Sequence, residues 1–268
     1  MGKEKNDERI LNFFPIENDQ PKTLTSNQIE HFNERGYIIP FDIYTQDETD
    51  ENRRYFDNLL EEVQKKGLNA YSINGYHKQC TGIWDIVTHP KILDLVEDLL
   101  GPNFVCWGTH YFCKLAHDPS SVPWHQDASY WPLSPSKTVT VWLAIDDADR
   151  ANSAMKIVAG SHRHGHLDFT MAGSDEKVVL GQKVTDAESY GDVVYMELAA
   201  GQISLHSDLL IHGSDPNHSA RRRCGLTMRY VSVDVRALTH WNETAVWCRG
   251  EDPARHWSNL PRPEYDST

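Results

Sequence analysis

The chain has 268 residues, a length that suits one large β-rich domain. Apolar residues make up 39% and aromatic residues 10%, which supports a packed core and excludes an intrinsically disordered chain. The net charge of −13 disfavours contact with nucleic acid or with an anionic membrane surface. No run of about 18 apolar residues occurs, so no membrane-spanning helix is expected.

The five cysteines are odd in number and form no CxxC pair, which argues against a disulfide framework. Cys106, Cys113 and Cys224 lie in apolar runs, where a thiol usually behaves as a small buried apolar group. The N-terminus lacks the apolar segment of a signal peptide, and the final Asp-Ser-Thr is not a peroxisomal address. These features predict a cytoplasmic protein. The sequence carries no signal for the oligomeric state.

Three helices are predicted after a polar lead-in over residues 1–22. Thr25 and Gln28 have the spacing of a capping box, which predicts a helix that ends at Gly36. A second helix is expected over 47–66 and a third over 90–101, each with its leucines and valines on one stripe.

The pattern then changes to that of strands. Over 138–145 the four aliphatic residues at odd positions share one face, and Thr140 and Trp142 lie on the other. We expect strands at 104–115, 138–145, 155–158, 193–198, 202–205, 209–212 and 225–235. The order of elements predicts an α+β, mainly β fold: a jelly roll or barrel with flanking N-terminal helices.

This order divides the chain into three parts. One domain is expected over 23–250, with a helical part at 23–101 and a jelly-roll core at 102–236. Residues 251–268 are expected to form an irregular tail.

His125 and Asp127 are the first candidates for chemistry. Residues two apart in a strand point to the same side, so one imidazole and one carboxylate would converge. With a distant second histidine they form the facial triad of iron(II) oxygenases, which leaves metal positions open for a cosubstrate and O₂. With fourteen histidines in the chain, however, the pair is as readily explained as a surface turn.

The segment 201–214 offers that second histidine. His206 and His212 fall on the polar side of an alternating pattern, which indicates a lumen or pocket rather than the main core. We interpret His212 as the third metal ligand. For His206 an ordinary hydrogen-bonded position is the simpler reading, with a role beside the metal or near the substrate as the alternative.

Arg223 follows His212 and could bind the distal carboxylate of 2-oxoglutarate, because a guanidinium pairs with a carboxylate through two parallel hydrogen bonds. Arg229 shares its strand face and competes for this role. Arg221 and Arg222 are read as a solvated turn. Trp142 either lines the same cavity or packs at its rim.

Two further segments have open interpretations. Tyr130 and Trp131 either approach the substrate or pack against the sheet. The run of histidines over 162–166 could suggest a second metal cluster, but its flanking and internal glycines favour a polar loop.

Several motifs in one order carry a resemblance to the phytanoyl-CoA dioxygenase (PhyH) family of iron(II)- and 2-oxoglutarate-dependent oxygenases. It extends from Leu24 to Arg236. The most specific stretches are Val122-Pro-Trp-His-Gln-Asp-Ala-Ser-Tyr-Trp-Pro-Leu133, Val139-Thr-Val-Trp-Leu-Ala144, Val158-Ala-Gly-Ser-His162, His212-Gly-Ser-Asp-Pro-Asn217 and Arg221–Gly225.

The resemblance implies a double-stranded β-helix, a small-molecule substrate, and iron(II), 2-oxoglutarate and O₂ as cofactor and cosubstrates. It implies His125, Asp127 and His212 as iron ligands. The positions for 2-oxoglutarate are taken here by Arg223, Ser214, Trp142 and His110, and His77 resembles a pocket histidine.

The chain departs from the family at Ala151-Asn-Ser-Ala154, and its −13 charge does not suit a polyanionic CoA ester. We therefore expect hydroxylation of a small polar or secondary metabolite, with release of succinate and CO₂. The alternatives are a cupin-like metal-dependent hydrolase or isomerase, and a catalytically silent binding protein of the same fold.

Overall fold

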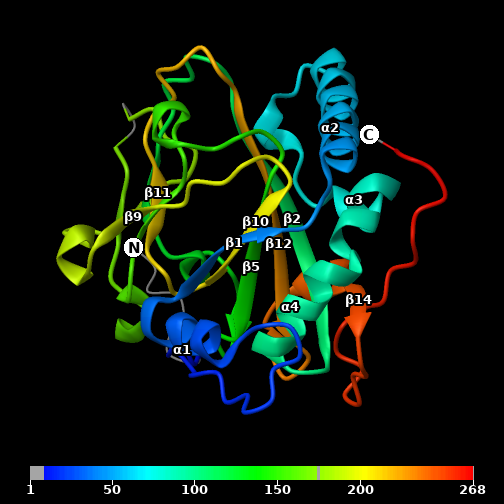
Figure 1. The fold of residues 1–268 in the computed structure, drawn as a ribbon, viewed down its shortest axis with the longest axis vertical. Coiled ribbons are helices and arrows are strands. Elements are labelled where there is room, and N and C mark those ends of the chain that lie inside the picture. The colour runs from blue at the N-terminus through cyan, green and yellow to red at the C-terminus, as the bar shows by residue number, and fades with distance from the viewer. Residues whose placement is uncertain (1–8, 174–175, 268) are drawn as a thin grey trace.

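The computed structural model describes residues 9–173 and 176–267, in which two antiparallel sheets face each other and helices cover the outer side of the larger one (Figure 1). The larger sheet has the strand order β1-β10-β5-β12-β2-β14, and the smaller has β3-β11-β6-β9. This is the predicted α+β, mainly β double-stranded β-helix.

The larger sheet consists of β1 (Tyr37–Asp42), β2 (Phe104–Lys114), β5 (Thr138–Ala144), β10 (Gln202–Ser207), β12 (Arg223–Ser232) and β14 (Val246–Arg249). The smaller sheet consists of β3 (Val122–His125), β6 (Lys156–Val158), β9 (Val193–Tyr195) and β11 (His212–Ser214). Two short pairs are β4 (Leu133–Ser134) with β13 (Arg236–Ala237), and β7 (Thr170–Met171) with β8 (Gln182–Lys183).

The helices are α1 (Ser26–Arg35), α2 (Gln46–Lys65), α3 (Thr81–Val87) and α4 (Pro90–Leu100). The capping box of Thr25 and Gln28 is present at the start of α1, and a second one begins α2 at Thr45. The prediction missed β1 and α3. Pro40 interrupts the strand pattern of β1, and α3 is too short to show a helical period.

The chain also contains short 3₁₀ helices. They are η1 (Ala70–Ser72), η2 (Tyr76–Lys78), η3 (Asp127–Ser129), η4 (Arg150–Asn152), η5 (Ser161–His164), η6 (Ala187–Tyr190) and η7 (His240–Thr244).

The main core lies between the helices and the larger sheet. The aliphatic face of β5 packs there against apolar side chains of the helices, as the alternation in 138–145 predicts. Its other face, with Thr140 and Trp142, points between the two sheets. The lumen of the β-helix is therefore walled by the polar faces of β5, β10 and β12.

A β-bulge in β2 changes which side chains face this lumen. On β12, Arg229 pairs with Gly108 but Tyr230 pairs with Cys106, so Trp107 is an extra residue. Cys106 faces the helical core, whereas Trp107 joins a second apolar cluster on the lumen side. The bulge thus brings an indole to a position that simple alternation would not give.

The predicted strand over 209–212 is wrong. β10 ends at Ser207 and β11 begins at His212 in the opposite sheet, so the intervening residues cross between the sheets. Leu209 and Ile211 are fully buried in this crossing, which explains their apolar character without a strand.

Both ends of the described chain pack on the domain. Residues 1–8 of the predicted lead-in lie outside the described residues, but Phe13 packs on the main core. The tail contains neither helix nor strand among its described residues, yet Trp257 is only 5% exposed and Arg262 pairs with Asp85.

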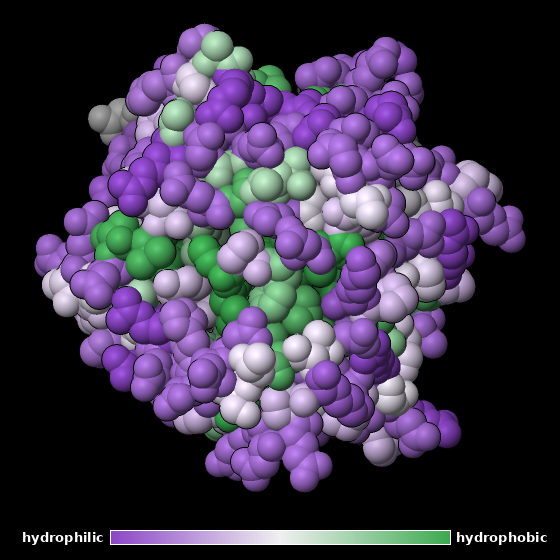
Figure 2. Space-filling model, viewed as in Figure 1, coloured by the Kyte–Doolittle hydropathy of each residue, from purple (hydrophilic) through white to green (hydrophobic). Residues whose placement is uncertain are grey.

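The face seen in Figure 2 is largely hydrophilic, with apolar side chains gathered in a hollow near its centre. Within the described residues, no helix is both long and apolar enough to cross a membrane.

Candidate metal centre

The structure brings His125, Asp127 and His212 together inside the β-helix. His125 ends β3, Asp127 begins η3 and His212 begins β11, opposite His125 in the ladder. Asp127 Oδ1 lies 3.7 Å from His125 Nε2 and 3.9 Å from His212 Nε2. Among the described residues, this is the group of three whose ligand atoms lie close enough to hold one metal ion.

The backbone orients both imidazoles toward a common point. His125 Nδ1 is 2.8 Å from the carbonyl of Pro123, and His212 Nδ1 is 2.9 Å from that of Leu210. A carbonyl only accepts, so each Nδ1 carries the proton and donates it. Each Nε2 then presents a lone pair, which is the form that binds a metal.

Gln126, between two of the ligands, fixes the loop that carries them. It points to the other side and is fully buried. Its amide donates to the carbonyls of Gly165 and Leu209 and accepts from the amide of Leu167. The hydrogen bonds of Gln126 thus stabilise the extended backbone from which His125 and Asp127 point to the same side.

The electrostatics of the three groups match a cation site. Burial alone would raise the pKa of Asp127, but the facing His212 and His125 hold the pKa well below its usual range. Burial, together with the neighbouring His125, lowers the pKa of His212 to about 3. A buried carboxylate beside two imidazoles is a donor set that suits iron(II), so the residues fit the expected metal.

The cavity around these ligands is lined by both sheets. It has a volume of about 40 Å³, so lining side chains must move aside to admit an organic cosubstrate. Its lining comprises the three candidate ligands together with Phe112, Val122, Trp142, Met155, His206, Gly213, Ser214, Arg223, Thr227 and Arg229.

Arg223 and Ser214 occupy one end of this lining. Arg223 Nη2 donates to Ser214 Oγ at 3.3 Å, and its Nε donates to the carbonyl of Ser153 at 3.0 Å. The guanidinium also lies 5.8 Å from the ring of Trp142. Three of the four positions singled out for 2-oxoglutarate are therefore neighbours.

The other three arginines of this region lie in different surroundings. Arg221 is exposed and pairs with Asp149, as a solvated turn predicts. Arg222 corrects that reading, because it is half-buried and joins Asp146 to Asp57 of α2. Arg229 lies in the metal cavity.

The sequence placed His206 and His212 on one alternating face, but they belong to different sheets, and His206 still lines the metal cavity. It is 1% exposed, and its ring centroid is 5.1 Å from that of His212. Neither ring nitrogen has a hydrogen-bond partner in the described part of the chain, so the simple hydrogen-bonded reading of His206 is not supported.

His77 and His110 lie outside the cavity lining. His77 is fully buried, and its two nitrogens contact Thr109 Oγ1 and the carbonyl of Thr244. His110 Nε2 contacts the carbonyl of Tyr71, and its ring packs on Phe112. Both nitrogens of His77 are thus engaged, as is Nε2 of His110, and neither ring lines the metal cavity.

The contacts of Tyr130 and Trp131 are those of side chains that pack inside the domain. The hydroxyl of Tyr130 accepts from the amide of Gln182 at 2.8 Å, and its ring meets that of His125 edge-on. Trp131 is 4% exposed in the lumen-side cluster.

The histidine run over 162–166 forms a turn, not a metal site. His162 is buried with Nε2 near the carbonyl of Asn33, while His166 Nε2 contacts Ser129 Oγ. These side chains point to different partners, in agreement with the loop prediction, although η5 gives the segment a short helical turn.

The prediction missed Phe112, Met155, Thr227 and Thr140. Thr140 donates to Asp127 Oδ2 at 3.4 Å, and its strand face was the one signal available. Met155 and Phe112 enter the lumen from positions that only the pairing of distant strands defines.

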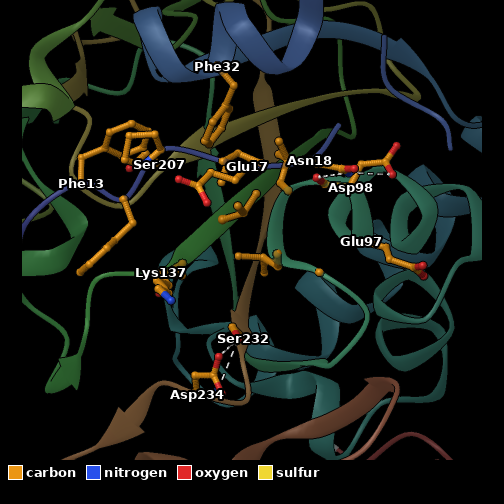
Figure 3. Close-up of a pocket in the computed structure, with 18 of the residues that line it drawn as sticks. Phe13, Glu17, Asn18, Phe32, Glu97, Asp98, Lys137, Ser207, Ser232 and Asp234 are labelled. Carbon is orange, nitrogen blue, oxygen red and sulfur yellow. Dashed lines mark hydrogen bonds between the residues drawn. The ribbon is translucent and has the colours of Figure 1, made fainter. Parts of the chain in front are cut away.

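A larger cavity, of about 700 Å³, lies away from the metal ligands (Figure 3). Phe32 of α1 points into it, and Lys137 and Asp234 lie on its far side. None of the three candidate ligands lines it, so its size does not make it the reaction site.

Comparison with known proteins decides the family. The family model described as phytanoyl-CoA dioxygenase (PhyH) matches residues 32–225, which include the three candidate ligands and Arg223. This chain belongs to the PhyH family.

The PhyH relatives include 2-oxoglutarate-dependent enzymes. A protein of Stutzerimonas stutzeri described as a probable alpha-ketoglutarate-dependent hypophosphite dioxygenase is 28% identical over 67% of this chain, a match that spans 64% of that protein. The L-proline trans-4-hydroxylase of Streptomyces griseoviridis is 26% identical over 65% of this chain and 72% of its own length.

A solved structure agrees with the fold. The non-heme monooxygenase ThoJ, in its apo form, superposes with a TM-score of 0.75 at 30% identity, over 88% of each chain. The PhyH fold and the predicted class of enzyme, an iron(II)- and 2-oxoglutarate-dependent dioxygenase, are thereby confirmed.

Proposed function

We propose that this protein hydroxylates a C–H bond of a small polar or secondary metabolite, with conversion of 2-oxoglutarate to succinate and CO₂. One observation carries the proposal: a buried two-histidine, one-carboxylate site and a buried arginine–serine pair line the same cavity.

His125, Asp127 and His212 would hold iron(II). When bound there, iron(II) with O₂ and 2-oxoglutarate supplies the oxidising chemistry that side chains lack. The protein positions the reactants: the Nδ1 hydrogen bonds fix the two imidazoles, and the enclosing sheets exclude water from the site.

Arg223 and Ser214 would bind the distal carboxylate of 2-oxoglutarate, with Trp142 beside it. Arg223 is 2% exposed, and the hydroxyl of Ser214 offers a second donor. A guanidinium in a buried site binds a carboxylate strongly, because the low local dielectric strengthens charge-assisted hydrogen bonds.

The small substrate is supported by two features. The acidic chain would repel a CoA ester, and the described relatives include enzymes named for hypophosphite and for L-proline. A cytoplasmic location is part of the proposal, since every described cysteine is a free thiol.

The deciding experiment measures succinate from 2-oxoglutarate in the presence of iron(II) and O₂, with candidate small metabolites added in turn. We expect iron-dependent succinate that one substrate stimulates, and loss of both iron binding and turnover in His125→Ala. Iron binding without 2-oxoglutarate turnover would favour the hydrolase, isomerase or binding-protein alternatives.

A matched arginine pair tests the cosubstrate site. Arg223→Gln should raise the KM for 2-oxoglutarate roughly 10- to 100-fold, the equivalent of one lost charge-assisted hydrogen-bond pair. Arg221→Gln, on the exposed turn, should leave that KM unchanged. Equal KM values in both variants would remove Arg223 from the proposed role.

A further inference from the structure

A second arginine reaches the metal cavity from the other end of the same strand. Arg229 and Arg223 share the lumen face of β12, with Cα atoms roughly 20 Å apart along the strand. Arg229 pairs with Thr140 of β5, the residue that donates to Asp127. Arg229 therefore lies level with a metal ligand, whereas Arg223 lies farther along β12.

Two buried indoles hold this guanidinium in place. The Arg229 Cζ atom is 5.5 Å from the ring centre of Trp107 and 5.2 Å from that of Trp131. Trp107 is the extra residue of the β-bulge, so the bulge itself supplies one of the two rings. Aromatic faces attract the cation but accept few of its N–H groups, which leaves its hydrogen-bonding capacity available.

Within the described residues, the Arg229 side chain has neither a hydrogen bond nor an ion pair, and its Nε is fully covered. Trp107 Nε1 is also covered and has no partner there. Arg223 differs, since Ser214, Ser153 and Phe112 all accept from it. Buried donors without acceptors are unfavourable, and Arg229 lines the metal cavity, so its guanidinium is suited to an acceptor-rich ligand.

The position of Arg229 separates it from the cosubstrate end. A molecule of the size of 2-oxoglutarate, anchored at the metal, can extend toward only one of two arginines so far apart on the strand. Arg223 has Ser214 and Trp142 beside it, which match the cosubstrate end. Arg229 lines the same cavity without such partners, which leaves it for a different molecule.

We propose that Arg229, packed on Trp107 and Trp131, binds the carboxylate of a small organic substrate on the side of the metal opposite the cosubstrate. The planar fork of Arg229 matches a carboxylate. This assignment rests on the proposed function, because it takes the metal cavity as the reaction site. It restricts the substrate to small carboxylic acids.

The test uses binding rather than turnover. Protein labelled with ¹⁵N and loaded with zinc(II) and 2-oxoglutarate is titrated with propanoate and, separately, with its neutral analogue propanamide. The Trp107 indole N–H signal, assigned by its absence in Trp107→Phe, reports the site. We expect propanoate to shift this signal with at least about tenfold higher affinity than propanamide. Equal affinities would overturn the proposal, and this comparison needs no variant at Arg229.

Two variants then locate the anion. Arg229→Gln should weaken propanoate binding at least about tenfold, whereas Arg229→Lys should keep a preference for propanoate over propanamide. Arg223→Gln should lose 2-oxoglutarate affinity and keep the propanoate shift. If Arg223→Gln abolishes the propanoate shift and Arg229→Gln does not, the anion occupies the cosubstrate end and the assignment is wrong.

The experiments can refute either proposal without the other. If propanoate selects the Arg229 site but no substrate stimulates succinate formation, the proposed hydroxylation of a small metabolite fails and the anion site stands. If succinate forms but propanoate and propanamide bind equally, the carboxylate assignment fails alone.

Discussion

At the scale of single residues, the site depends on which atoms keep a proton. Backbone carbonyls fix the Nδ1 protons of His125 and His212, so a short-range contact within each chain segment prepares a metal ligand. The same principle acts on Asp208, a buried carboxyl that accepts from Ser136 Oγ at 2.8 Å.

Asp208 should make the stability of the metal-free protein depend on pH. Burial, with the nearby Asp127 charge, raises the pKa of Asp208 to about 7, against the weaker opposing effect of Ser136. The folded state therefore binds a proton that the unfolded state releases above pH ~4. Its contribution is fully present below that pH and is lost as pH rises toward 7, by up to roughly a few kcal/mol.

Asp208→Asn removes this titration. Urea unfolding at several pH values between about 4 and 7 should show the free energy of unfolding of the original protein falling relative to that of the variant as pH rises. Buried histidines such as His77, whose pKa burial lowers to about 4, act in the opposite direction but are common to both proteins. Parallel pH profiles for the two proteins would contradict the prediction.

At the scale of elements, the packing of β5 against β12 requires a glycine, which has no side chain, at one position. The ring of Trp142 on β5 lies against Gly225 of β12, where an added Cβ would come within 2.0 Å of Trp142 Cζ2. A glycine is therefore required for the indole to lie flat along the cavity wall.

Gly225→Ala should lower the free energy of unfolding by about 1–3 kcal/mol, because the indole or the strand must shift. It should also raise the KM for 2-oxoglutarate, since Trp142 borders that end of the cavity. Gly108→Ala in β2 is the matched control, because its added Cβ would meet nothing closer than 3.7 Å. Similar losses of stability in the two variants, measured by denaturant unfolding, would refute the explanation.

At the scale of the whole molecule, the tail completes the wall behind the proposed carboxylate site. Trp257 packs in the same cluster as Trp107 and Trp131, and its Nε1 donates to the carbonyl of Val235 at 3.1 Å. The far end of the chain therefore supports the aromatic rings around Arg229.

Trp257→Ala should reduce the free energy of unfolding by roughly 3–5 kcal/mol, as expected for a buried indole. Tyr265→Ala in the same tail is the control, because Tyr265 is 72% exposed and should change stability by less than about 0.5 kcal/mol. Chemical unfolding of both variants measures the difference. A stable Trp257→Ala variant would mean that the tail packs without supporting the domain.

The sequence by itself determined the chemistry and the main faces of the strands. The His125–Asp127 spacing, the later His212 and the alternation around Trp142 are local patterns, and a two-residue strand period needs no partner to be recognised. The capping box of Thr25 could be read for the same reason, since its hydrogen bonds join neighbours in the chain.

Only the tertiary structure decided how these patterns meet. His206 and His212 belong to different sheets, so their closeness arises from the crossing between β10 and β11. Trp107 faces Arg229 because a bulge shifts β2 against β12, and a bulge is defined by the partner strand. The metal ligands could thus be found from spacing, whereas the surroundings of Arg229 required the pairing of segments far apart in the chain.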